Sequence, residues 1–132
     1  MIVGNKITKV EGARESDEPK RPSNFKVNLK DAKFKGKTVE VTYEYSVEYG
    51  EKDGFMKFEG IVSAEEEKEV IEELKKEWTE KKRLPAKYTE MLFNAIKYYG
   101  DLSGVFVSRV LNLAPPIQPP RYTISEKPPE KK

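Results

Sequence analysis

Apolar and polar residues alternate strictly over residues 38–50, which is the clearest pattern in the chain. One side of this segment carries only valine and tyrosine, whereas the other carries threonine, serine and glutamate. Successive side chains of a strand point to opposite faces, so the pattern predicts a strand with one apolar face. The same alternation predicts shorter strands over residues 25–29 and 56–62, and a less regular one over residues 2–10.

The segments between these predicted strands differ in length and character. GEKDG (50–54) has the length and the glycines of an antiparallel hairpin connection, and DAKFKGK (31–37) can join the second and third strands. In contrast, GARESDEPKRPS (12–23) is polar and contains two prolines. It predicts a crossover or flap and no strand, so the second strand need not pair with the first.

A change to helical spacing follows the last predicted strand. Ser63 and Glu66 fit a capping box at the start of a first helix, which Leu84 and Pro85 end. A second helix is predicted over residues 86–111, and it is apolar nearly all round from residue 102 onward. A helix of this kind is buried on more than one side, and in so short a chain the second partner is expected to be another subunit. The candidate interface residues are Leu102, Phe106 and Val110.

Together these elements predict an α+β fold: a four-stranded antiparallel sheet with a long polar connection after the first strand, followed by two helices, the second long and apolar. A length of 132 residues is typical of one domain. We assign residues 1–120 to that domain. Residues 121–132 are rich in proline and lysine and are expected to form a flexible tail.

The composition removes several kinds of chemistry. Cysteine and histidine are both absent, so there is no thiolate nucleophile, no disulfide, and neither of the commonest transition-metal ligands. We therefore expect no catalytic residues, no metal and no cofactor. Carboxylate-only acid–base chemistry remains open, and a carboxylate-dependent enzyme using Glu40, Glu44, Glu48 or Glu59 is kept as a third hypothesis. Glu40, Glu44 and Glu48 share one strand face, for which a solvated surface is the expected role.

Charge and hydropathy limit the kinds of binding partner and the cellular compartment that we expect for this protein. The net charge of +2 is spread evenly along the chain, which is not typical of nucleic-acid binders. The first residues lack the apolar segment of a secretory signal, and no stretch approaches the length of a membrane span, so a cytoplasmic protein without membrane insertion is expected. Charged residues, mostly Lys and Glu, make up 36% of the chain, as is typical of thermophile proteins.

Some aromatic and glycine positions leave alternatives open. Tyr45 and Tyr49 belong to the apolar strand face, where a tyrosine can either enter the core or form a recognition surface. Trp78 closes the stripe of the first helix and is expected in the core or at the border of a groove. Gly100 and Gly104 lie within the second helix, where they predict close packing against a neighbour.

The order of the predicted elements and the amino-acid sequences of three segments resemble those of the SecB chaperone family and its archaeal SecB-like members. The segments are SNFKV (23–27), FMKFEGIV (55–62) and LFNAIKYYGDLSGVFVSRVLNLAPPIQPP (92–120). In that family a helix beginning at an LF-type dipeptide runs into an N-L-A-P or L-P-P ending, which residues 112–115 match. The resemblance implies a homo-oligomer, a dimer or tetramer, with hydrophobic grooves that hold unfolded or nascent polypeptide without ATP. One branch of the family serves toxin–antitoxin systems, which makes a toxin–antitoxin component a further candidate partner.

Carried over by position, the groove lies between residues 12–23, the sheet edge and the second helix. The candidate polypeptide contacts are residues of the second helix that would line this groove, together with aromatic residues of the strands and the first helix. They are Phe25, Tyr45, Tyr49, Phe58, Trp78, Tyr88, Leu92 and Tyr99. This chain is slightly basic where the bacterial export chaperone is acidic, so the resemblance supports the holding activity and not the export partner. The alternative from another class is a carrier of small apolar ligands, with a pocket between the sheet and the long helix.

Overall fold

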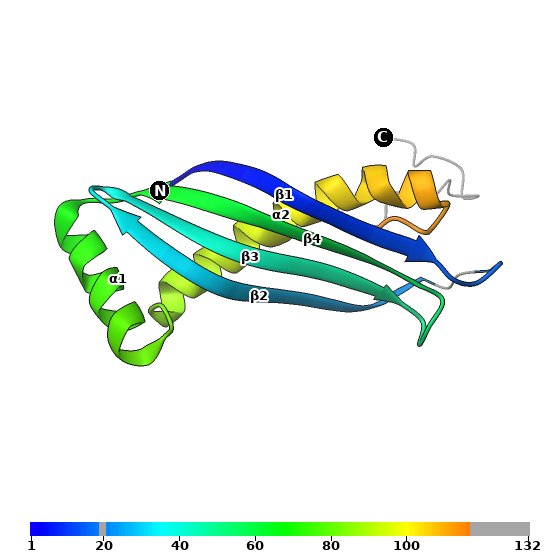
Figure 1. Ribbon diagram of the computed structural model, residues 1–132, viewed down its shortest axis with the longest axis horizontal. Coiled ribbons are helices and arrows are strands. Elements are labelled where there is room, and N and C mark those ends of the chain that lie inside the picture. The colour runs from blue at the N-terminus through cyan, green and yellow to red at the C-terminus, as the bar shows by residue number, and fades with distance from the viewer. Residues whose placement is uncertain (19–20, 117–132) are drawn as a thin grey trace, which may run out of the picture.

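Figure 1 shows a computed structural model of the chain, which describes residues 1–18 and 21–116. Four strands come first: β1 (Ile2–Arg14), β2 (Pro22–Lys35), β3 (Thr38–Tyr49) and β4 (Gly54–Glu65). Two helices follow, α1 (Lys68–Lys81) and α2 (Ala86–Leu111). The predicted α+β fold is confirmed, and the long second helix has the predicted bounds. The predicted tail, residues 121–132, lies outside the described residues.

The strands form one antiparallel sheet in the order β1-β4-β3-β2. The first strand therefore pairs with the fourth, and β2 lies at the opposite edge of the sheet. The long connection left the partner of the first strand open, and this order is compatible with it. Among the described residues, each outer strand has a single partner: β1 pairs with β4, and β2 pairs with β3. An edge strand leaves a row of backbone N–H and C=O groups unpaired, so both edges can accept a further strand.

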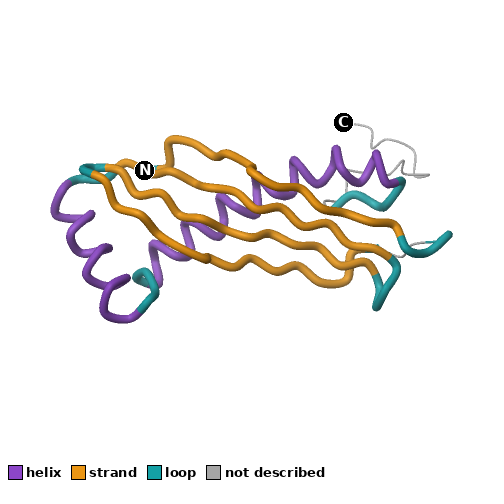
Figure 2. The backbone as a smooth tube through the Cα atoms, viewed as in Figure 1, coloured by secondary structure: helices purple, strands orange, loops and turns teal. Residues whose placement is uncertain are grey.

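The helices lie on one side of the sheet and at one of its ends. Figures 1 and 2 show α2 crossing behind the strands along a diagonal, with α1 beyond one end of the sheet. The apolar face of β3 points toward α2, and its side chains are all fully buried: Val39, Val41, Tyr43, Tyr45, Val47 and Tyr49. β4 adds Met56, Phe58 and Val62 to the same core. The alternation along β3 thus locates the core correctly.

α2 lies close to the sheet where its two central glycines face it. A Cβ atom added at Gly100 would lie 2.5 Å from Cδ2 of Tyr45, and one added at Gly104 would lie 2.7 Å from Cγ of Pro116. Real Cβ atoms do not approach other atoms so closely, so the predicted role of both glycines in close packing is confirmed. Beside Gly100, the Tyr45 hydroxyl donates a hydrogen bond of 2.5 Å to Oδ1 of the buried Asp101.

The two hairpins differ in how well the sequence predicted them. The GEKDG connection is confirmed, because β3 ends at Tyr49 and β4 begins at Gly54. The connection expected over residues 31–37 is wrong, since β2 continues to Lys35 and only Gly36 and Lys37 remain between the strands. Gly36 has a φ of +61°, a conformation that short hairpin loops require. Hydrogen bonding to β3 extends β2 through Lys33 and Lys35, although lysine has a low intrinsic preference for strands.

The polar segment 12–23 is shorter as a connection than predicted. β1 continues to Arg14, with Gly12 opposite Met56 and Arg14 opposite Gly54, and β2 already begins at Pro22. The expectation that no part of this segment forms a strand is therefore wrong. Backbone hydrogen bonds to β4 determine where β1 ends, and they do not depend on apolar side chains.

The predicted start of the first helix is also wrong. Ser63 lies within β4, opposite Glu40 of β3, and the strand continues to Glu65. α1 begins at Lys68, and its N-cap residue, Glu67, makes no side-chain capping hydrogen bond. β4 is a central strand with a neighbour on each side, so two rows of backbone hydrogen bonds outweigh one capping interaction.

We predict that Gly100→Ala lowers the free energy of unfolding by about 1–2 kcal/mol. The added methyl group would overlap the ring of Tyr45, a cost that exceeds the helix propensity gained from alanine. Urea unfolding followed by the fluorescence of Trp78 measures the change. Gly4→Ala is the matched control, because nothing lies within 4 Å of a Cβ there. Equal stability of Gly100→Ala and the wild type would contradict the close approach of α2.

Candidate polypeptide-binding surface

Four of the predicted polypeptide contacts lie in the core. Tyr45, Tyr49, Phe58 and Leu92 have no exposed surface at all. The rings of Tyr45 and Phe58 stack with centroids 5.7 Å apart and an angle of 15° between their planes. In this arrangement a bound polypeptide cannot touch these four side chains. Between the two roles left open for Tyr45 and Tyr49, the structure places both residues in the core.

The buried tyrosines keep hydrogen-bond partners at the border of the core. The Tyr49 hydroxyl donates to the carbonyl oxygen of Ala114, just after α2, and the Tyr43 hydroxyl donates to Oδ1 of Asn5 at 2.5 Å. Burial raises the pKa of Tyr49 to about 12 and also raises the pKa of Tyr45. Both phenols thus remain protonated donors that attach the sheet to α2 and to the segment after it.

Three other predicted contacts are half-buried at the edges of the core. Trp78 and Tyr88 pack in part against the core and remain in part accessible, and Tyr99 is half-buried as well. The Tyr88 hydroxyl donates to Oε1 of Glu66 at 3.4 Å. Each of the three is less exposed than Phe25.

Phe25 is the predicted contact that the structure exposes most. It lies on the edge strand β2 with 41% of its surface exposed. Lys97 of α2 places its Nζ atom 5.3 Å from the centroid of the Phe25 ring, and the same ammonium pairs with Oδ2 of Asp101 at 2.6 Å. The Phe25 ring is therefore held against the flank of α2, with part of it open to solvent.

Phe25 continues into an apolar row along β2. Phe25, Val27 and Leu29 lie opposite Val47, Tyr45 and Tyr43, and residues opposite one another in a sheet share a face. Val27 and Leu29 are half-buried and pack against the core on the side of α2. We call these three residues the β2 strip. The alternation of residues 25–29 already showed the row, but not that it lies at an edge, where Val27 and Leu29 also become candidate contacts.

A second apolar surface lies on the outer face of α2. Leu102, Phe106 and Val110, the predicted interface residues, are 43%, 73% and 84% exposed. They recur every four residues, so they form one stripe on the helix. The described part of the chain contains nothing that covers this stripe.

The other edge strand offers a different surface. Val3 and Val10 of β1 are about half exposed, but they stand apart in a strand with two register irregularities. Bulges twist an edge and hinder the addition of a further strand. The two irregularities of β2 lie before Asn24 and after Leu29, outside the β2 strip, whereas one of those in β1 lies between Val3 and Val10. The β2 strip is the longer continuous apolar row of the two edges.

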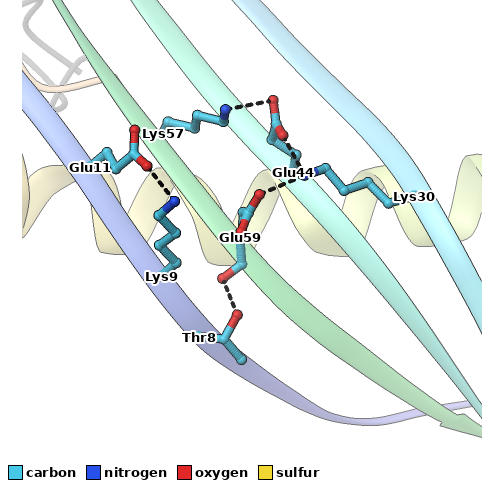
Figure 3. A network of polar contacts seen from close by, with 7 residues as sticks. All are labelled: Thr8, Lys9, Glu11, Lys30, Glu44, Lys57 and Glu59. Carbon is cyan, nitrogen blue, oxygen red and sulfur yellow. Dashed lines mark hydrogen bonds and ion pairs between the residues drawn. The ribbon is translucent and has the colours of Figure 1, made fainter.

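The sheet face opposite α2 carries a network of ion pairs (Figure 3). Lys30 Nζ lies 2.5 Å from Glu59 Oε1 and 2.9 Å from Glu44 Oε2, and Lys57 Nζ lies 3.5 Å from Glu44 Oε1. The hydrogen bonds to Glu59 and Glu44 raise the pKa of Lys30 to about 12. The same contacts lower the pKa of both carboxyl groups. At neutral pH, therefore, neither carboxyl is a proton donor and Lys30 is not a base.

The geometry also bears on the other hypotheses. Within residues 1–18 and 21–116, no cluster of acidic side chains suits a metal ion. A hollow of about 870 Å³ lies between α1 and α2, with Glu77, Arg83 and Phe93 among its lining residues. In the described part of the chain, side chains fill the space between the sheet and α2, where the carrier hypothesis requires a pocket. Nor is any helix in these residues long and apolar enough to cross a membrane.

Comparison with known proteins gives one likeness in structure. No protein-family model and no curated protein matches the sequence. Among solved structures, the chain is similar to the Mycobacterium tuberculosis Rv1957 SecB-like chaperone in complex with a ChAD peptide from the Rv1956 HigA1 antitoxin. The likeness covers 97% of this chain and 91% of that one, at 11% sequence identity and a TM-score of 0.48. At this level it assigns this chain neither an activity nor a partner.

We predict that Lys30→Gln weakens the dependence of stability on acid. The folded-state pKa values of Glu44 and Glu59 lie below their ordinary value of 4.5, so their stabilising effect is present above that pH and is lost as the pH falls through the lowered values. In the variant, the urea midpoint should fall less between about pH 7 and about pH 3 than in the wild type. Lys33→Gln, on the same strand, should behave as the wild type. An unchanged acid dependence in Lys30→Gln would show that the network does not hold these carboxylates in their charged form.

Proposed function

We propose that the chain is a holding chaperone, which binds non-native polypeptide reversibly and without ATP. The observation that carries this proposal is the β2 strip, an apolar row on a sheet edge that has no partner strand among the described residues. An extended polypeptide can pair its backbone with such an edge whatever its sequence, while alternate side chains meet the apolar row. The clients we propose are unfolded or nascent chains, a toxin–antitoxin component among them, and the proposed compartment is the cytoplasm.

Backbone pairing suits a chaperone because it tolerates many sequences. The N–H and C=O groups of β2 supply affinity that does not depend on the client's side chains. Phe25, with Val27 and Leu29 beside it, adds burial of apolar surface, worth about 25 cal/mol for each Å² removed from water. Lys26 and Lys30 border the row on the other face of the strand. Such lysines discourage permanent aggregation at an edge, which fits reversible binding.

We also propose that the protein works as a homo-oligomer built through the outer stripe of α2. Phe106 and Val110 are the most exposed large apolar residues on that helix. An apolar stripe on a regular helix is self-complementary in a symmetric dimer, in which each copy covers the stripe of the other. Dimerisation there would leave the β2 strip open, because the strip lies at the sheet edge and the stripe on the far side of α2.

The two other hypotheses lack a comparable site. A carrier needs an internal cavity, whereas Tyr45, Phe58 and Leu92 occupy the space between sheet and helix. A carboxylate-dependent enzyme needs one protonated and one ionised group, whereas Glu44 and Glu59 are both held ionised by Lys30. Neither hypothesis gains a specific observation in its favour.

We predict that the wild type suppresses the aggregation of a chemically unfolded model protein without ATP, and that Phe25→Ser weakens the suppression about tenfold. Loss of one buried aromatic contact at about 1.4 kcal/mol corresponds to that factor. Light scattering over a range of chaperone concentrations measures it. Val10→Ser is the matched control, an exposed apolar residue on the opposite edge strand, and should behave as the wild type. If the wild type does not suppress aggregation even in several-fold excess, the proposed function is wrong.

The oligomer is tested separately by size-exclusion chromatography with light scattering. We predict a wild-type mass that is a multiple of 15.2 kDa and a single-chain mass for the double variant Phe106→Glu and Val110→Glu. Carboxylates cannot be buried unpaired in an apolar interface, so these changes should abolish it. Lys75→Glu with Thr79→Glu places the same charges four residues apart on the exposed side of α1 and should leave the mass unchanged. A wild type of 15.2 kDa would contradict the proposed assembly.

A further inference from the structure

The segment after α2 reverses direction and returns along the helix. Asn112 ends α2 in a left-handed conformation with a φ of +56°. The Leu113 N–H then donates to the carbonyl oxygen of Ser108, and three residues later Pro116 lies against Gly104. While the chain advances from 113 to 116, its contacts therefore move back toward the start of the helix. The end of the described chain runs antiparallel to α2.

The returning segment runs along the flank of α2 that faces the β2 strip. Ser108, Gly104, Asp101 and Lys97 follow one another at spacings of four, three and four residues, so they lie on one side of the helix. Pro116 lies at Gly104, and at the far end of this row Lys97 lies over the ring of Phe25. A chain that continues past Pro116 in the same direction is aimed at Phe25.

The residues beyond Pro116 have the length and the composition to reach this strip. From Gly104 to Lys97 is about 10 Å along a helix axis. Residues 117–124 would span about 26 Å if extended, more than twice that distance. Their sequence, IQPPRYTI, holds Ile117, Tyr122 and Ile124, three apolar residues that can cover an apolar row, and Tyr, Thr and Ile favour extended pairing.

We propose that residues 117–124 of the same chain occupy the β2 strip when no client is bound. This inference deepens the proposed function, on which its regulatory consequence rests: a client must displace the segment, so the chain carries its own competitor. A binding site that is free for only a fraction of the time binds its ligand more weakly by that fraction. Such competition would release clients without ATP and would shield Phe25 from unwanted contacts.

The docking itself is tested without any client. The variant Ile117→Ser, Tyr122→Ser and Ile124→Ser keeps the length of the chain but removes its apolar residues. We expect hydrogen–deuterium exchange, read by mass spectrometry, to become several-fold faster for residues 25–29 in this variant and to stay unchanged in β1. The control variant Lys127→Ser, Lys131→Ser and Lys132→Ser should exchange as the wild type does. Equal exchange at residues 25–29 in all three proteins would overturn the proposal.

The competition is tested with a fluorescent, permanently unfolded polypeptide as the probe. If the strip is free about one tenth of the time in the wild type, the triple serine variant should bind the probe about tenfold more tightly. Equal affinity of the two proteins would overturn the competitor role while the proposed chaperone function stands. If neither protein binds the probe but exchange at residues 25–29 still becomes faster in the variant, the chaperone function fails and the docking is upheld.

Discussion

The contact between Tyr45 and α2 is the constraint on which the rest of the structure depends. Gly100 lets the helix backbone lie directly on the Tyr45 ring, and the Tyr45 hydroxyl donates to Asp101 one residue later. Below the helix, the same ring stacks on Phe58 of the neighbouring strand. A single tyrosine thus determines how near α2 comes to the sheet and which side of the helix faces it. Any larger residue at position 100 would raise the helix and open the core.

The contact between Tyr45 and α2 is connected to the surface residue Phe25 through two side chains of α2. Asp101 accepts from Tyr45 and pairs with Lys97, and Lys97 lies over Phe25 on the edge strand. The position of Phe25 is therefore linked to the core, although the residue itself is 41% exposed. An apolar side chain on an edge usually moves freely, whereas this one is held in place on a strand edge that has no partner strand in the described part of the chain. The proposed client site and the proposed path of residues 117–124 both follow from that arrangement.

The sequence predicted the elements that have strong periodicity. The alternation along β3 located the core, and the bounds of α2 were right. The twelve-residue polar segment allowed β1 and β2 to lie apart, as they do in the sheet, but it did not predict the strand order. Strand ends were predicted less well, because backbone pairing extended β2 through its lysines and β4 through Ser63. For the site, an aromatic residue on an apolar strand face gives no sign of its depth. Tyr45 and Phe25 look alike along the chain, and only the strand order shows that one is central and the other lies at an edge.

The most direct test of the account is to ask which surface touches a client. A photoreactive benzoylphenylalanine is placed in turn at Phe25, at Val10 on the other edge strand, and at Phe106 on the outer stripe of α2. Each protein is then irradiated with a radiolabelled unfolded polypeptide. We predict strong cross-linking to the polypeptide from position 25 and little from positions 10 and 106. Cross-linking mainly from position 10 or 106, or from none of the three, would contradict it.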